Sequence, residues 1–230
     1  MIVHKYNATR PLSALPQRKT TQHRDNTNST SFFFRAPMRF FETFNQYMRQ
    51  VVGQGRPQPF FVLSAGCGLG KEPVSVVIIW LKVLEAFSAS PEDFPLVVIA
   101  LDAVAENLDA LTAGEFQLNR WDIEQLPYYR PYFELVDPPD IYRVRALPHV
   151  LAPIHTTRMD LAFHPVVRSL RKFTPDGLGF HAVYCNSVTM YFDRRPGVKT
   201  RIEANLRSLL RQEAASDFFF LHNEYGGGND

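Results

Sequence analysis

The stretch LSAGCGLGKEPVS, residues 63–75, decides the fold of this 230-residue chain. It follows an apolar run at residues 60–63 and ends in a helix-like segment that Pro73 opens. The turn carries three alternating glycines, Gly66, Gly68 and Gly70. A proline suits the first helical position because its ring fixes φ and its missing N–H is not needed there. The pattern predicts a strand, a glycine turn open to a ligand, and a helix N-terminus that can face an anionic group.

Glycine turns of this kind occur in dinucleotide, flavin and S-adenosylmethionine sites, and also as plain tight turns. The next apolar run, LVVIALD at residues 96–102, ends in a carboxylate about thirty residues later, where a nucleoside ribose lies in a doubly wound sheet. Asp102 can therefore accept hydrogen bonds from both ribose hydroxyls. An alternative role for Asp102 is to cap a helix expected near residues 105–111, and one residue can do both.

Composition places the chain among globular proteins. The hydrophobic share of 45% is sufficient for a sizeable core, and a net charge of +2 does not favour nucleic acid or an anionic membrane as a partner. No apolar run approaches the roughly eighteen residues of a membrane span. Two cysteines, Cys67 and Cys185, fit a reducing compartment and predict a cytoplasmic location.

The N-terminal 30 residues differ from the rest of the chain. They hold five basic residues against Asp25 alone, are rich in hydroxyl and amide side chains, and show no sustained hydrophobic period. Such a segment cannot bury enough apolar surface to order itself, so residues 1–30 are expected to form a disordered polar tail. Their acid-poor composition also fits a transit or secretion address.

Strand and helix patterns alternate from residue 31 to the end of the chain. Helical spacing predicts a helix that includes residues 40–51 and another over residues 73–87, and buried strands are expected at 179–185 and 217–222. Residues 121–153 are rich in proline and tyrosine and contain one alternating run at 140–147. The expected fold is α/β, a mostly parallel, doubly wound sheet with a small antiparallel β insertion at about 121–153.

Several separated motifs together resemble the CheR-type chemotaxis-receptor glutamate methyltransferases, which use S-adenosylmethionine. Residues 31–35 (SFFFR) resemble the family's T-x-F-F-R, and residues 64–73 (SAGCGLGKEP) resemble its S-A-x-C-S-T-G-E-E-P. Further matches in the same order are residues 100–102 (ALD), 113–116 (AGEF), 159–161 (MDL), 185–193 (CNSVTMYFD) and 220–224 (FLHNE). The resemblance covers about residues 31–224 and implies a Rossmann-like class I methyltransferase domain over 31–230.

The resemblance also implies roles for single residues. Glu72 and Asp102 would hold the amino-acid and ribose parts of S-adenosylmethionine, while Asp160 and Leu161 would frame the adenine. Ser31 and Arg35 would close the site, and Asn186 and Ser187 would lie beside the cofactor with the turn glycines. The implied catalytic residues are Arg35, which would steer an anionic acceptor, and Tyr191, which would line the path from the sulfonium. From the residues alone, an alternative for Arg35 is an N-terminal helix residue paired on the surface, and an alternative for Tyr191 is a half-buried core aromatic.

This chain departs from the family pattern at several positions. Asn186 and Ser187 stand where the family has arginine and asparagine, which removes a cation able to pair with an acceptor carboxylate. Lys71 replaces the first acid of the family's E-E-P, Leu69 a small hydroxyl residue and Val104 a second aspartate. Only the short tail is expected where the family carries a helical N-terminal domain, and no counterpart of the family's final antiparallel strand is expected after Glu224.

The predicted function is transfer of a methyl group from S-adenosylmethionine to a carboxylate of a protein acceptor, which is glutamate O-methylation. Such a transfer needs alignment and electrostatic support rather than a general base, because the acceptor is already an anion. The alternatives are a methyltransferase with a different acceptor and an S-adenosylmethionine-binding regulatory module that has lost transfer. A Rossmann oxidoreductase shares the glycines and the strand-end acid but leaves residues 191–193 unexplained.

Overall fold

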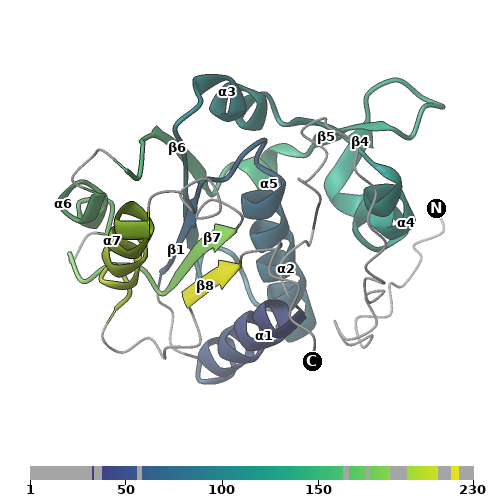
Figure 1. Cartoon of the computed structure of the whole chain (residues 1–230). Helices are drawn as coiled ribbons and strands as arrows, with labels where there is room; N and C mark the ends of the chain where they lie inside the picture. Colours follow the sequence, from purple (N-terminus) through teal and green to yellow (C-terminus); the bar gives the residue numbers. More distant parts are fainter. Residues whose placement is uncertain are drawn as a thin grey trace, which may run out of the picture.

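The computed structural model describes residues 33, 38–55, 59–162, 166–174, 177–186, 196–211 and 219–222 (Figure 1). Its helices are α1 (Met38–Gly53), α2 (Lys71–Phe87), α3 (Ala105–Ala113), α4 (Arg120–Tyr129), the 3₁₀ turn η2 (Arg130–Tyr132), α5 (Pro148–Leu151), α6 (Val166–Arg171) and α7 (Pro196–Arg207). Its strands are β1 (Phe60–Ala65), β2 (Leu96–Asp102), β3 (Glu115–Gln117), β4 (Phe133–Leu135), β5 (Arg143–Ala146), β6 (Ile154–Arg158), β7 (Ala182–Asn186) and β8 (Phe219–His222). The prediction of a disordered tail at residues 1–30 falls outside the described residues.

Within the described residues, the central sheet has five strands in the order β6-β2-β1-β7-β8, and all neighbouring pairs are parallel. The carboxyl ends of these strands therefore meet at one edge, as expected for a sheet built from alternating strands and helices. β1 lies at the centre of the sheet, so the turn that follows it enters the middle of this edge. The parallel α/β sheet expected from the sequence is confirmed.

The sheet is buried on both faces because successive side chains of each strand point to opposite sides. Val62 of β1 packs into a cluster that contains residues of α1 and α2. Its neighbour Leu63 packs into a second cluster, which contains residues of α6 and α7. Figure 1 shows α1 and α2 on one side of the sheet and α6 and α7 on the other. The fold is therefore doubly wound.

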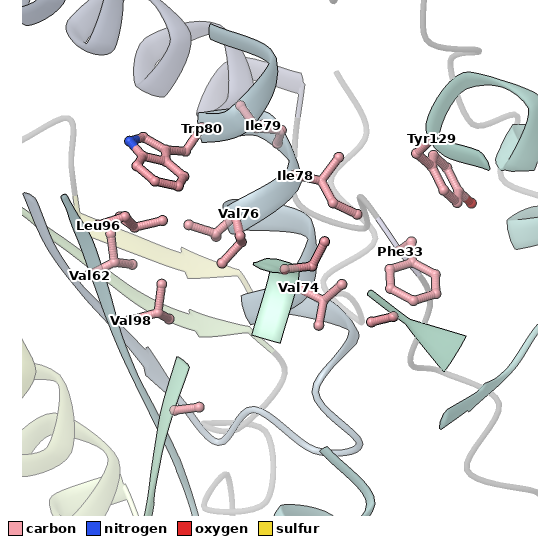
Figure 2. Packing of buried hydrophobic residues seen from close by; sticks show 14 of the residues in the cluster. Phe33, Val62, Val74, Val76, Ile78, Ile79, Trp80, Leu96, Val98 and Tyr129 are labelled. Atoms are coloured by element: carbon pink, nitrogen blue, oxygen red, sulfur yellow. The ribbon is translucent and has the colours of Figure 1, made fainter. Parts of the chain in front are cut away.

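Helix α2 is the most deeply buried helix of the first cluster, and it is apolar over more than one face. Figure 2 shows Val76 and Trp80 facing the strand residues Val62 and Leu96. Val74 and Ile78 lie on the side of α2 toward Phe33 and Tyr129. The helix is buried on several sides because α1, α5 and the sheet all pack against it. It begins at Lys71, two residues before the start that Pro73 suggested, and Pro73 is tolerated in the first turn.

A second, antiparallel sheet of strands in the order β3-β5-β4 follows α3. Its strand β5 lies inside the alternating run at residues 140–147. The sheet also uses β3, which precedes the stretch 121–153, and helix α4 begins one residue before that stretch and continues into it. Phe116, Phe133 and Val144 of this sheet are buried in the same cluster as α2. The sheet is thus attached to the core through an apolar face. No helix in the described ranges is long and apolar enough to cross a bilayer.

Candidate functional site

The glycine turn links β1 to α2 at the centre of the carboxyl edge. Its backbone N–H groups at Gly66 and Cys67 both donate to Leu101 O, at 2.7 and 2.9 Å, which ties the turn to the end of β2. All three glycines have positive φ, 72° at Gly66, 53° at Gly68 and 88° at Gly70. Glycine reaches this left-handed region without steric cost, so the sequence G-x-G-x-G determines the path of the backbone.

The space around two of the turn glycines differs. A Cβ on Gly70 would lie 2.4 Å from Leu111 Cδ1 and 2.8 Å from Leu111 Cβ, so Gly70 lets α3 pack against the start of α2. A Cβ on Gly68 would meet nothing within 4 Å. The sequence predicts that all three glycines contact the ligand. In the structure Gly70 packs against Leu111 and Gly68 borders open space, and a ligand contact at each of the three glycines stays a prediction.

Asp102 ends β2 beside this open space, and only 8% of it is exposed. Its Oδ2 accepts a hydrogen bond from Gly68 N at 2.8 Å. Its Oδ1 accepts from Val104 N at 2.9 Å and from Asn107 Nδ2 at 3.2 Å. The contact with Val104, two residues on, is an Asx turn. The residue at the N-cap position of α3 is Val104 rather than Asp102, so the capping role considered from the sequence is not adopted.

Glu72 supplies the second carboxylate, from the first turn of α2. Its Oε1 accepts a hydrogen bond from the buried Ser64 Oγ at 2.7 Å. Burial raises the pKa of the Cys67 thiol, and the negative charges of Asp102 and Glu72 raise it further. The negative charges of both carboxylates therefore reach Cys67, in the middle of the glycine turn. Cys67 stays a neutral thiol at neutral pH and packs as a small apolar side chain.

Lys71, which replaces an acid of the family motif, does not face the ligand side of the turn. Its Nζ lies 2.7 Å from Asp122 Oδ2 of α4, and the two side chains are 5% and 0% exposed. The same ammonium lies 5.5 Å from the centroid of the Phe33 ring. The cation is thus paired within the protein, on the side toward α4.

Asp122 joins three parts of the chain. It accepts a hydrogen bond from Phe33 N at 2.8 Å in addition to the contact with Lys71. It also forms a capping box with Asn119 at the start of α4, in which each side chain accepts from the other's backbone N–H. Burial raises the pKa of Asp122, against the lowering effects of Lys71 and these N–H groups. The sequence interpretation missed Asp122, although Asn119-x-x-Asp122 at a helix start is a recognisable capping pattern.

Phe33 is the one described residue of the SFFFR motif, and it is fully buried. Its ring centroid lies 5.3 Å from that of Phe116, 5.8 Å from that of Tyr129 and 5.1 Å from that of Phe133. These rings come from β3, α4 and β4, so Phe33 packs against the antiparallel sheet and α4. Aromatic pairs at these distances add stabilisation beyond their buried area.

The loop after β6 also lies at this edge. Met159 N donates to Asp102 O at 2.9 Å, so the loop begins against the end of β2. Asp160 Oδ1 accepts from Ala162 N at 2.8 Å in a local turn, and Leu161 is buried. The structure therefore brings residues 160–161 to the same edge as Asp102. Their assignment to the adenine stays a prediction.

The remaining predicted site residues lie outside what the structure describes. Ser31, Arg35, Ser187 and Tyr191 fall outside the described residues. Asn186 is described in its backbone only, where it ends β7 and pairs with His222 of β8. Their roles stay predictions.

The described groups fit S-adenosylmethionine. Its ribose hydroxyls are donors, and its ammonium and sulfonium are cations, which suits an edge with two carboxylates, Asp102 and Glu72. The space at Gly68 allows a ligand to contact the backbone. A cation at Lys71 would oppose this ligand if it faced the turn, but it is neutralised by Asp122 instead.

The fold and this edge together define a Rossmann-like domain of the class I methyltransferase type. A family model described as "CheR methyltransferase, SAM binding domain" matches residues 28–216. The chain therefore belongs to the CheR methyltransferase family, as its motifs indicate, and S-adenosylmethionine is its cofactor.

Solved methyltransferases are similar at low identity. Magnesium protoporphyrin IX methyltransferase (ChlM) from Synechocystis PCC 6803 with bound SAM is 13% identical, with 75% of this chain and 55% of that chain covered and a TM-score of 0.32. The glycopeptide N-methyltransferase MtfA complexed with SAM is 14% identical, with coverages of 81% and 56% and a TM-score of 0.32. An S-adenosylmethionine-dependent methyltransferase from Clostridium acetobutylicum ATCC 824 is 10% identical, with coverages of 80% and 48% and a TM-score of 0.33. The chain spans about half the length of these proteins. No curated protein sequence matched it.

Alanine at Gly68 and at Gly70 should have different consequences. Gly70→Ala should lower the thermal midpoint strongly, because its Cβ would overlap Leu111 in addition to the positive-φ cost. Gly68→Ala should cost only about 1–2 kcal/mol of stability through its φ, but it should weaken binding of S-adenosylhomocysteine about tenfold or more. Calorimetry of binding and thermal unfolding measure the two effects.

Gly55→Ala is the matched control for Gly68→Ala. Gly55 also has positive φ, and a Cβ added to it would meet nothing within 4 Å, but it follows α1, away from the turn. It should share the stability cost and leave the affinity unchanged. Wild-type affinity in Gly68→Ala would show that the cofactor does not approach the backbone there.

Lys71→Met should destabilise the protein by about 3–5 kcal/mol, because it leaves the buried Asp122 carboxylate without its cation. Asp122→Asn should also be costly, and the double variant should lose less than the sum of the two single losses. Urea unfolding of the four proteins gives the coupling. Lys82→Met on the same helix, a half-buried lysine outside this pair, is the control and should change stability by less than about 1 kcal/mol. Additive losses would contradict a direct interaction.

Proposed function

We propose that this chain transfers the methyl group of S-adenosylmethionine to a carboxylate of a protein, as glutamate O-methylation. The observation that carries the proposal is the pair of carboxylates, Glu72 and Asp102, at the glycine turn of a domain of the CheR family, where Gly68 borders open space. Because the chain spans only part of the length of similar structures, its activity, acceptor and partner all belong to this proposal.

The proposed chemistry makes few demands on side chains. S-adenosylmethionine supplies a methyl group on a cationic sulfur, and an acceptor carboxylate can take it without losing a proton. The residues of the chain therefore need to orient both partners and exclude water rather than act as a base. Glu72 and Asp102 are proposed to hold the cofactor, with Asp160 and Leu161 beside its base. Arg35 and Tyr191 are proposed to orient the acceptor.

The position of Lys71 supports retention of cofactor binding. From the sequence, this lysine puts a cation where the family carries a carboxylate, which would weaken a site for a cationic ligand. In the structure the ammonium pairs with Asp122 and leaves Glu72 as the acid of the first helical turn. The departure at residue 71 therefore does not argue against a functional cofactor site.

The departure at Asn186 and Ser187 concerns the acceptor. It removes an arginine that could form a two-bond pair with a carboxylate, so recognition of the acceptor would fall to Arg35 or to a different group. A cytoplasmic location and a protein partner remain parts of the proposal.

Transfer of radiolabelled methyl groups from S-adenosylmethionine to proteins of a cell lysate tests the proposed activity. We expect label that is released as methanol by mild base, because methyl esters hydrolyse under these conditions and methylated amines do not. Arg35→Ala should lower transfer about tenfold or more through loss of a charge-assisted contact. Arg120→Ala, at an arginine whose side chain is 94% exposed, is the control and should transfer at the wild-type rate.

Two other outcomes would contradict ester formation. Base-stable label would assign a different acceptor atom. Cofactor binding without any transfer would favour a regulatory module that has kept its ligand and lost catalysis.

A further inference from the structure

The hydrogen bonds of Asp102 limit what its carboxylate can offer to a ligand. A carboxylate has about four acceptor positions, two on each oxygen. Oδ1 already accepts from Val104 N at 2.9 Å and from Asn107 Nδ2 at 3.2 Å. Oδ2 accepts from Gly68 N at 2.8 Å. Among the described contacts, one acceptor position remains, and it is on Oδ2.

Two of these three contacts belong to the framework of the edge. The Gly68 N–H fixes the middle of the glycine turn, and the Val104 N–H closes the turn from β2 to α3. Both are backbone groups whose positions follow from the path of the chain, and a carboxylate that is only 8% exposed needs such donors because an unbonded buried charge is costly. They therefore stay in place when a ligand arrives.

The third contact comes from a side chain. Asn107 is the third residue of α3 and half-buried, and its amide nitrogen takes the second position on Oδ1. An amide N–H and a ribose hydroxyl are both donors, so they compete for the same lone pair. Asn107 is consequently the residue that decides whether Oδ1 can take a hydroxyl.

We propose that Asp102 holds one hydroxyl of the cofactor ribose, through Oδ2, and that Asn107 prevents a second hydroxyl from binding at Oδ1. This differs from the expectation, drawn from the sequence, that Asp102 accepts from both hydroxyls. The inference rests on the S-adenosylmethionine site and not on the methyl acceptor. It makes Asn107 a specificity-determining residue, because the chain should tolerate loss of one ribose hydroxyl and not of the other.

Calorimetry with three ligands tests the proposal: S-adenosylhomocysteine, its 2′-deoxy analogue and its 3′-deoxy analogue. One deoxy analogue should bind about tenfold or more weaker, as expected for loss of a hydrogen bond to a charged group. The other should bind within about twofold of the parent. Equal losses of tenfold or more for both analogues would overturn the single-hydroxyl contact, and so would no loss for either.

Asn107→Leu tests the role of the amide, because leucine is similar in size and has no donor. The freed position on Oδ1 should let the second hydroxyl contribute, so the analogue tolerated by the wild type should now bind about fivefold or more weaker than the parent ligand. This ratio is measured within one variant, so a general loss of stability does not change it. An unchanged ratio would overturn the part assigned to Asn107.

Asp109→Asn provides the control on the same helix, at an exposed residue. It should keep the wild-type ratios for both analogues. Should Asn107→Leu fail to fold, Asn107→Ala removes the same donor and should give the same change of ratio. Failure of methyl transfer in the lysate experiment would leave these binding ratios unaffected, so the two proposals fail separately.

Discussion

The buried ion pair between Lys71 and Asp122 connects the start of α2, in the parallel-sheet core, to the start of α4. Lys71 is the first residue of α2, directly after the glycine turn, and Asp122 lies in the first turn of α4. The same carboxylate also accepts a hydrogen bond from Phe33 N. The core, α4 and Phe33 thus meet at one carboxylate, next to the glycine turn.

A buried ion pair stabilises a protein only when neighbouring groups form hydrogen bonds to both of its charged side chains. Removing two charges from water costs several kcal/mol per ion, and the mutual attraction offsets this only with good geometry and additional hydrogen bonds. Asp122 has these, from Lys71 Nζ and from the backbone N–H groups of Phe33 and Asn119. The pKa of Asp122 is nevertheless raised by burial, so desolvation remains the larger effect. The pair therefore fixes the relative position of three segments more than it adds stability.

On the ligand side of the turn, the carboxylates have a different kind of partner. There the carboxylates of Glu72 and Asp102 accept hydrogen bonds from neutral donors: the Ser64 hydroxyl, the Asn107 amide and backbone N–H groups. A neutral donor holds a carboxylate without cancelling its charge, so the negative potential of the carboxylate remains available to a cationic ligand. Pairing Lys71 away from this side and holding the acids with dipoles together maintain an edge suited to a sulfonium cofactor.

The sequence alone determined the parallel α/β fold, the glycine turn and the strand-end position of Asp102, because these follow from local periodicity and from the backbone freedom of glycine. It also determined the family, through motifs whose order is independent of their contacts. Only the tertiary structure decided what Lys71 does, because its partner Asp122 lies 51 residues away, on another helix. The same holds for Gly70, which accommodates Leu111 of α3, and for Asn107, whose amide takes a lone pair of Asp102. A sequence pattern shows which chemical groups are present. Which of them pack together, and which donor occupies a given lone pair, depends on segments that are distant in sequence, so both are decided only in the folded chain.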